Sequence, residues 1–233
     1  MTRRRLLRFG LTAVAMVVVA GAATFWWVFL RDDTPSEAAL VDREVVADPV
    51  GELDGTWAVQ GGRDVWAGYR IDEHLSALDN TAVARTRDVE GTLTVAGTEV
   101  TEVAVEVDMT TLTSEDDQVP AVGNRDAAMR TKALETDTFP AASFTLTEPI
   151  ELGELPEPGD TITVEAVGEV DLHGVTRTVT VPLQARWNGE VVDLTASLDV
   201  ALADYDIEQP AAQIVTVADQ GTLELQLTFA RER

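Results

Sequence analysis

The chain has 233 residues, of which 41 are acidic and 17 are basic, so its formal net charge is −24. This length allows one sizeable domain with additional segments. A strongly acidic surface repels phosphate backbones and therefore argues against nucleic-acid binding. Because the chain has no cysteine, disulfides and thiolate metal sites are excluded, and an exported domain would depend on its hydrophobic core.

The N-terminal region contains an uncharged apolar run over residues 9–30, preceded by four arginines within residues 1–8. A helix rises about 1.5 Å per residue, so this run can cross a hydrocarbon core about 30 Å thick. The positive-inside rule places the basic tail, residues 1–8, in the cytoplasm. We therefore predict a single-pass protein of the cell membrane, with a transmembrane helix over 9–30 and an extracytoplasmic C-terminal domain.

Two other readings of the same segment stay open. The sequence TRRRLLR at residues 2–8 resembles a twin-arginine export signal, which is an address and not an anchor. Ala20-Gly21-Ala22 also fits a signal-peptidase site. Cleavage there would leave an apolar N-terminus, and the run is longer than the usual signal-peptide core of about 7–15 residues. The uncleaved anchor is therefore favoured, and twin-arginine export is compatible with it.

Residues 31–53 are charged, contain Pro35 and Pro49, and show no sustained periodicity. This composition predicts a tether that holds a folded domain away from the bilayer. Residues 54–233 follow as one domain, since no repeat or low-complexity block interrupts them.

Short runs in which apolar and polar residues alternate dominate this domain, as in residues 162–172, 175–183, 192–200 and 223–229. A two-residue period indicates strands with one buried and one exposed face. His173-Gly174 and Asn188-Gly189 are typical of tight hairpin turns between such strands. Regular strands of this kind predict a closed or sandwiched antiparallel sheet, and the period alone does not distinguish the two.

A single segment, residues 124–135, favours a helix of two to three turns, with Asn124 as its N-cap. Its alanines, methionine and leucine are good helix formers.

Polar motifs with a recognisable chemistry are scarce. The two histidines, His74 and His173, have no evident partner set for catalysis or metal binding, so we expect an exposed strand-end residue and a turn-stabilising residue respectively. The acidic run at residues 115–117 lacks the ligand spacing of an EF-hand loop. Glycine-rich phosphate loops and a serine nucleophile elbow are also absent from the sequence. We therefore expect no cofactor, no metal and no enzymatic activity.

Several segments in order resemble the YceI family of lipid- or polyisoprenoid-binding, lipocalin-like proteins, over about residues 55–231. The segments that carry the resemblance are GTW at 55–57, VWAGYRIDE at 65–73, LETDTFPAASF at 134–144, LHGVTRTVTVPL at 172–183 and ADYDIEQP at 203–210. The resemblance implies an all-β, antiparallel, lipocalin-like barrel of about eight strands with one short helix. It also implies an interior that holds an isoprenoid lipid or a quinone.

Eight residues are candidates for lining that interior, with core packing as the alternative for each: Trp57, Trp66, Tyr69, Phe139, Phe144, Val164, Ala166 and Leu172. Together with the anchor, the resemblance suggests an extracytoplasmic protein that holds or transfers such a lipid at the membrane. A non-enzymatic envelope or stress scaffold that uses the acidic surface is the alternative. A homodimer is compatible with either function.

Overall fold

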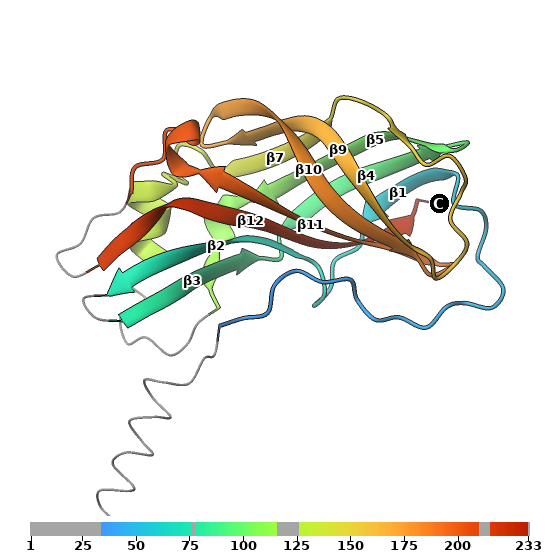
Figure 1. Ribbon diagram of the computed structural model, residues 1–233, viewed down its shortest axis with the longest axis horizontal. Coiled ribbons are helices and arrows are strands. Elements are labelled where there is room, and N and C mark those ends of the chain that lie inside the picture. Colours follow the sequence, from blue (N-terminus) through green and yellow to red (C-terminus); the bar gives the residue numbers. More distant parts are fainter. Residues whose placement is uncertain (1–33, 76–77, 116–125, 210–214, 233) are drawn as a thin grey trace, which may run out of the picture. The chain divides into compact units, whose positions relative to one another are not determined.

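The computed structural model describes residues 34–75, 78–115, 126–209 and 215–232. Within these ranges, twelve antiparallel strands join into one sheet (Figure 1). The strands are β1 (Gly55–Val59), β2 (Trp66–Leu75), β3 (Leu78–Thr86), β4 (Val89–Ala96), β5 (Glu99–Asp108), β6 (Thr113–Ser114), β7 (Ala141–Leu146), β8 (Ile150–Glu151), β9 (Thr161–Leu172), β10 (Val175–Trp187), β11 (Val191–Ala201) and β12 (Val215–Arg231).

The sheet closes into a barrel because β1 pairs with a strand on each side. Residues 57–59 pair with residues 229–231 of β12, and residues 55–58 pair with residues 92–95 of β4. The ring runs in the order β1, β4, β5, β7, β9, β10, β11 and β12, which gives the eight strands expected. This ring of backbone hydrogen bonds decides between the two arrangements that the sequence left open, in favour of the barrel.

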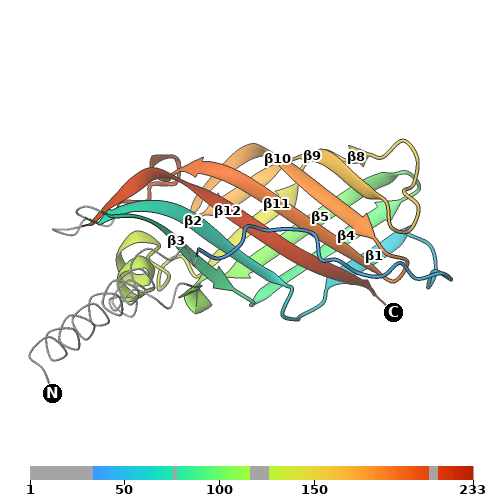
Figure 2. The same ribbon diagram turned by 60° about the horizontal axis from the view of Figure 1, so that its bottom comes forward.

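Of the strands outside this ring, β2, β3 and β6 extend one end of the barrel, and β8 lies at the other end (Figure 2). β2 follows β1 along the same edge of β12, where residues 66–75 pair with residues 215–226. β3 forms a hairpin with β2 and pairs on its other side with the two-residue β6. β8 pairs with the first residues of β5.

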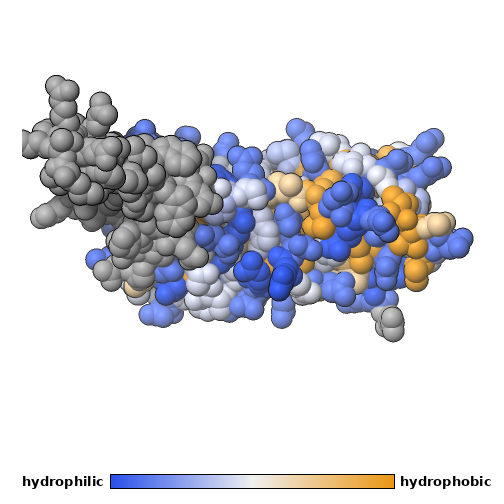
Figure 3. Space-filling model, turned by 90° about the horizontal axis from the view of Figure 1, so that it is seen from below, coloured by the Kyte–Doolittle hydropathy of each residue, from blue (hydrophilic) through white to orange (hydrophobic). Residues whose placement is uncertain are grey.

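The predicted alternation is confirmed in strands such as β5 and β9, which bury one face, whereas residues 192–196 of β11 are all buried. In β9, Ala166, Val170 and Leu172 are buried, whereas Glu165 and Glu169 are exposed. The inward faces of the strands join into one large hydrophobic core. Figure 3 shows one side of the exterior, where polar and charged residues are interspersed and apolar residues gather toward one end. The hairpin turn at Asn188-Gly189 is also present, between β10 and β11.

The predicted helix is present in part, over residues 126–133, and its final turn, η2 (Met129–Ala133), is a π-helical turn. There, the Leu134 backbone N–H donates to the Met129 carbonyl, five residues earlier, at 2.8 Å. The expected N-cap, Asn124, lies outside the described residues. Two short 3₁₀ turns, η1 (Met109–Thr111) and η3 (Leu202–Tyr205), carry no periodic signal and were not expected.

Residues 35–50 run along the outside of β12 and neighbouring strands (Figure 2), and we name this segment the strap. The Arg43 guanidinium donates from Nε to both oxygens of the buried Asp193 carboxylate, at 3.1 and 2.9 Å. Further along, the Val46 and Val50 backbone N–H groups donate to the carbonyls of residues 188 and 189, both at 2.8 Å. The strap therefore belongs to the folded unit, which spans Pro35–Arg233, although the sequence assigned residues 31–53 to a tether.

The predicted transmembrane helix, residues 9–30, lies outside the described residues. Among the residues that the structure describes, no helix is both long and apolar enough to cross a membrane.

Candidate ligand-binding cavity

The interior of the barrel contains an apolar cavity of about 120 Å³. Seven strands and the segment after β5 contribute its walls, so residues far apart in the sequence meet around one space. Its lining residues are Ala67, Gly68, Tyr69, Val103, Val105, Val107, Met109, Leu112, Ala142, Ser143, Phe144, Val170, Leu172, Val181, Leu183, Leu194, Ala196, Ser197, Leu198, Leu223, Glu224, Leu225, Leu227 and Phe229.

Two smaller cavities, each of about 50 Å³, lie beyond the ends of the main cavity. One shares Val103, Leu183 and Leu194 with the main cavity and is also lined by Trp187; we name this side the Trp187 end. The other shares four lining residues with the main cavity and reaches the helix over 126–133; we name this side the helix end. The three cavities thus follow one another along the barrel interior.

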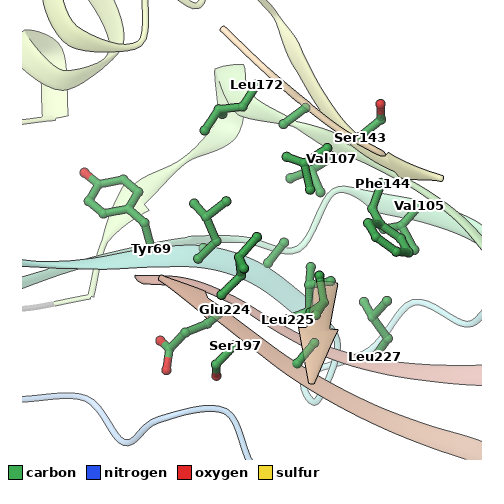
Figure 4. A pocket seen from close by; sticks show the side chains of 18 of the residues that line it. Tyr69, Val105, Val107, Ser143, Phe144, Leu172, Ser197, Glu224, Leu225 and Leu227 are labelled. Atoms are coloured by element: carbon green, nitrogen blue, oxygen red, sulfur yellow. The ribbon is translucent and has the colours of Figure 1, made fainter. Parts of the chain in front are cut away.

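The polar residues of the main cavity do not present their polar atoms to it. Figure 4 shows the hydroxyl groups of Ser143 and Ser197 and the carboxylate of Glu224 pointing away from the cavity. Phe144, Leu225 and the other labelled apolar side chains surround the space. The cavity therefore favours apolar matter, because a polar group brought into it would lose its hydrogen bonds with water.

The volume of the main cavity sets a scale for its ligand. A dry apolar cavity of about 150 Å³ is known to accept benzene. At about 120 Å³, the main cavity accepts an apolar group of about five or six carbons without rearrangement. A longer chain requires the two neighbouring cavities as well, or movement of the side chains between them.

Four of the eight predicted lining residues do line these cavities. Tyr69 and Leu172 lie where the main cavity meets the helix-end cavity, and Phe144 lies in the main cavity. Val164 lines the cavity at the Trp187 end.

The other four predicted residues do not line a cavity. Trp57 is fully buried in the core, where its indole Nε1 donates to the Leu53 carbonyl at 2.9 Å. Trp66 stacks on the Arg85 guanidinium, 3.7 Å from the ring centroid. Phe139 packs against His173, and Ala166 is fully buried without facing any of the three spaces. Aromatic character was thus a poor guide to the cavity lining. It indicates that a side chain packs against others, but not whether that side chain borders a cavity.

Sequence reasoning missed most of the aliphatic wall, including Leu223, Leu225 and Leu227 of β12. Their alternation was visible in the sequence and could have identified them. It also missed Gly168, whose role depends on a neighbouring strand. A Cβ atom at Gly168 would lie 2.5 Å from the Phe144 ring, so only glycine lets this ring cross β9.

The predicted turn at His173-Gly174 is confirmed, with φ angles of +55° and +74°. His173 Nδ1 donates to the Tyr205 carbonyl at 3.0 Å, and Nε2 lies 3.3 Å from the Glu135 carboxylate. His173 is therefore a structural residue of the turn, as the sequence predicted. His74 is exposed at the end of β2, beside Asp79, also as predicted.

A charged cluster lies on the outer side of the cavity wall, next to the start of the strap. The buried Glu224 carboxylate accepts the Ala38 backbone N–H at 3.2 Å and lies 3.6 and 3.9 Å from Arg70 and Arg85. Arg70 and Arg85 also donate to the carbonyls of residues 35 and 36. Burial lowers the pKa of the Arg85 guanidinium, and the Glu224 charge opposes this shift. The cluster joins the strap to the cavity wall without entering the cavity.

Within the described ranges, no three side chains of the metal-binding types lie together. The geometry of the described cavity supports burial of an apolar ligand, because the labelled hydroxyl and carboxylate groups of its lining point away from the space (Figure 4).

Comparison with known proteins agrees with this architecture. A YceI-like domain matches residues 69–229. No curated protein matches the chain. Among solved structures, a polyisoprenoid binding domain from Saccharophagus degradans, implicated in plant cell wall breakdown, is 18% identical with a TM-score of 0.58, and the match covers 76% of this chain and 98% of that one.

Two further structures share the fold. BcnA from Burkholderia cenocepacia is 14% identical with a TM-score of 0.51, over 70% of this chain and 95% of that one. The YceI protein of Campylobacter jejuni is 12% identical with a TM-score of 0.50, over 64% of this chain and 85% of that one. Because the matched domain covers more than half of its length, the chain belongs to the YceI-like family.

Proposed function

We propose that this protein binds an isoprenoid lipid or the isoprenoid tail of a quinone inside its barrel. The observation that carries the proposal is the line of three apolar cavities through the barrel, with the hydroxyl and carboxylate groups of the main cavity's lining pointing away from it (Figure 4). The similar domain from Saccharophagus degradans, described as polyisoprenoid binding, supports the same class of ligand.

The energetics favour such a ligand. Each buried methylene contributes about 0.8 kcal/mol, so a chain of two or three isoprene units gains several kcal/mol from apolar contact alone. Isoprenoid chains are methyl-branched and irregular in width, which suits a wall of valine, leucine and phenylalanine side chains. Few polar contacts are then needed to hold the ligand.

The site of action belongs to the proposal as well. An uncleaved helix over residues 9–30 would keep the barrel beside the bilayer from which such lipids are drawn. We propose an extracytoplasmic barrel that holds or transfers its ligand there. Repulsion between the acidic exterior and anionic lipid headgroups would then keep the barrel in solution beside the bilayer.

A lipid analysis with matched variants tests the proposal. The full chain is purified, its lipids are extracted, and isoprenoid species are quantified by mass spectrometry per mole of protein. Ala196→Phe places a ring at a lining position, whereas Thr180→Phe places the same ring at an exposed position of the neighbouring strand β10 that lines none of the three cavities. Because the two variants carry the same anchor, lipid bound outside the barrel contributes equally to both.

We expect isoprenoid species with the wild type and with Thr180→Phe, and their strong depletion with Ala196→Phe. Equal amounts in all three proteins would place the lipid outside the cavity and refute the proposed function. Absence of isoprenoids from all three proteins, also after incubation with a prenylated quinone, would refute it too.

A further inference from the structure

The two ends of the barrel are closed in different ways. At the Trp187 end the wall is a continuous backbone ladder, because β1 pairs with both β4 and β12. Fully buried Trp57 and Phe229 fill the interior behind this ladder. An apolar chain could pass through this wall only by separating paired strands.

At the helix end the backbone ladder is interrupted. β5, which follows β4 in the ring, ends at Asp108, one residue after Val107, which pairs with Val89. β3 continues beyond this point, and among the described residues its free side pairs only with β6, at Ala84 and Arg85, and with the backbone of Glu115. Among the residues that the structure describes, no strand therefore joins β3 to the end of β9 at this level.

Side chains of the helical segment fill this gap. Met129, Ala133 and Leu134 line the helix-end cavity together with Met109. In the described structure, the hydrogen bonds that hold the helix run to residues 112–114. The Arg130 guanidinium donates to the Leu112 carbonyl at 2.7 Å, and the Asp126 carboxylate accepts from the Ser114 hydroxyl and backbone N–H. The apolar contacts that Met129, Ala133 and Leu134 make at the cavity cost less free energy to break than the backbone hydrogen bonds of a strand ladder.

The residues after the helix are fixed by His173. Glu135, directly after Leu134, has a left-handed φ of +43°, and its carboxylate lies 3.3 Å from His173 Nε2. Phe139 packs on the His173 ring at a centroid distance of 4.4 Å. His173 also holds the Tyr205 carbonyl at the end of η3, so one side chain joins three segments around this end.

We infer that the apolar ligand enters and leaves at the helix end, where the helix over 126–133 moves about Glu135 while His173 holds the hinge. The inference rests on the proposed function, since it concerns the same cavity. His173 acts here as a positioning residue that does not touch the ligand. The wall at the Trp187 end stays closed during exchange.

A reversible lock tests the inference, because the chain has no cysteine of its own. Ser114→Cys with Asp126→Cys replaces two side chains in direct contact and would join the start of the helix to β6. Thr56→Cys with Thr94→Cys is the matched control, since these side chains face each other at 3.4 Å between β1 and β4. Binding of a short-chain prenylated quinone to the full chain in nanodiscs is followed by tryptophan quenching in stopped flow.

In the oxidised lock we expect the association and dissociation rate constants to fall together, by about tenfold or more, with an almost unchanged Kd, as for a gate. Reduction should restore both rates, and the control disulfide should change neither. Unchanged rates in the oxidised lock, or slowing by the control disulfide alone, would overturn the proposed entrance. Absence of quenching in the unlocked protein would instead overturn the proposed function, and the inference with it.

The role of His173 has its own test in His173→Asn. Asparagine tolerates the left-handed backbone of this position but does not reach Glu135 as the imidazole does. We expect both rate constants to rise while the Kd changes little. A variant that only melts earlier, with unchanged rate constants, would overturn the positioning role and leave His173 as a turn residue.

Discussion

The strap, residues 35–50, leads to a specific prediction. The sequence indicated a tether at these residues, but the structure packs them against the barrel. In Arg43→Ala, the buried Asp193 carboxylate loses two hydrogen bonds from Nε, and Thr228 loses one from Nη2. Asp193 would keep only the Thr228 hydroxyl among its described partners, at 2.7 Å.

The magnitude follows from burial. Removing one partner of a buried ion pair costs about 3–5 kcal/mol, because the remaining charge is left without compensation. The Asp193 side chain is 2% exposed, but that of Arg43 is 30% exposed, so water replaces part of what is lost. We therefore expect Arg43→Ala to lower the free energy of unfolding by about 2–3 kcal/mol.

Urea unfolding of the full chain, followed by near-ultraviolet circular dichroism, measures this loss. Asp193→Asn and the double variant complete a double-mutant cycle that isolates the pair from other effects of each substitution. Because the double variant has no unpaired charge, it should be more stable than the sum of the two single losses implies. A change within about 0.5 kcal/mol for Arg43→Ala, or strict additivity in the cycle, would refute the reasoning and favour a free tether.

Three further predictions concern single positions. Gly168→Ala brings a methyl group within 2.5 Å of the Phe144 ring, so we expect a loss of about 1–3 kcal/mol in urea unfolding together with weaker quinone binding; normal binding would contradict the role of this glycine. Trp57→Phe removes the hydrogen bond from the indole to the buried Leu53 carbonyl, so we expect the free energy of unfolding to fall by about 1–3 kcal/mol in the same assay. The Kd for the quinone should not change, and a higher Kd would mean that this ring contacts the ligand. The neighbouring charge of Glu99 raises the pKa of the Glu151 carboxyl, so the folded state binds this proton more tightly than the unfolded chain and loses stability as the pH rises through that pKa. Glu151→Gln should therefore raise the thermal midpoint at neutral pH and lose this advantage in acid, and an equal gain at every pH would exclude the charge repulsion as its cause.

The strand pattern was predictable because alternation is a local property of the chain. β9, β10, β11 and β12 follow runs that can be read directly from the sequence, and both hairpin turns contain the glycine that their backbone requires. Closure was not predictable from this period, because it depends on β1 meeting β12, about 170 residues later in the chain.

The sequence predicted which side chains point into the barrel, but not which of them border a cavity. The sequence distinguishes buried from exposed positions along β9, but whether a buried side chain borders a space depends on its neighbours across the barrel. Ala166 and Leu172 share the inward face of one strand, yet only Leu172 borders a cavity. The strap was hidden for a similar reason, since nothing near Arg43 in the sequence indicates that its partner is Asp193.

The central claim is that an isoprenoid chain lies inside the barrel, and photolabelling tests it most directly. The full chain in nanodiscs is irradiated with a photoactivatable prenyl probe, with and without excess unlabelled prenylated quinone, and the labelled peptides are identified by mass spectrometry. We predict saturable labelling of inward-facing residues, such as Val105, Phe144 and Leu225, that disappears on competition. Labelling confined to exposed residues or to the segment over 9–30, or labelling that competition leaves unchanged, would contradict the claim.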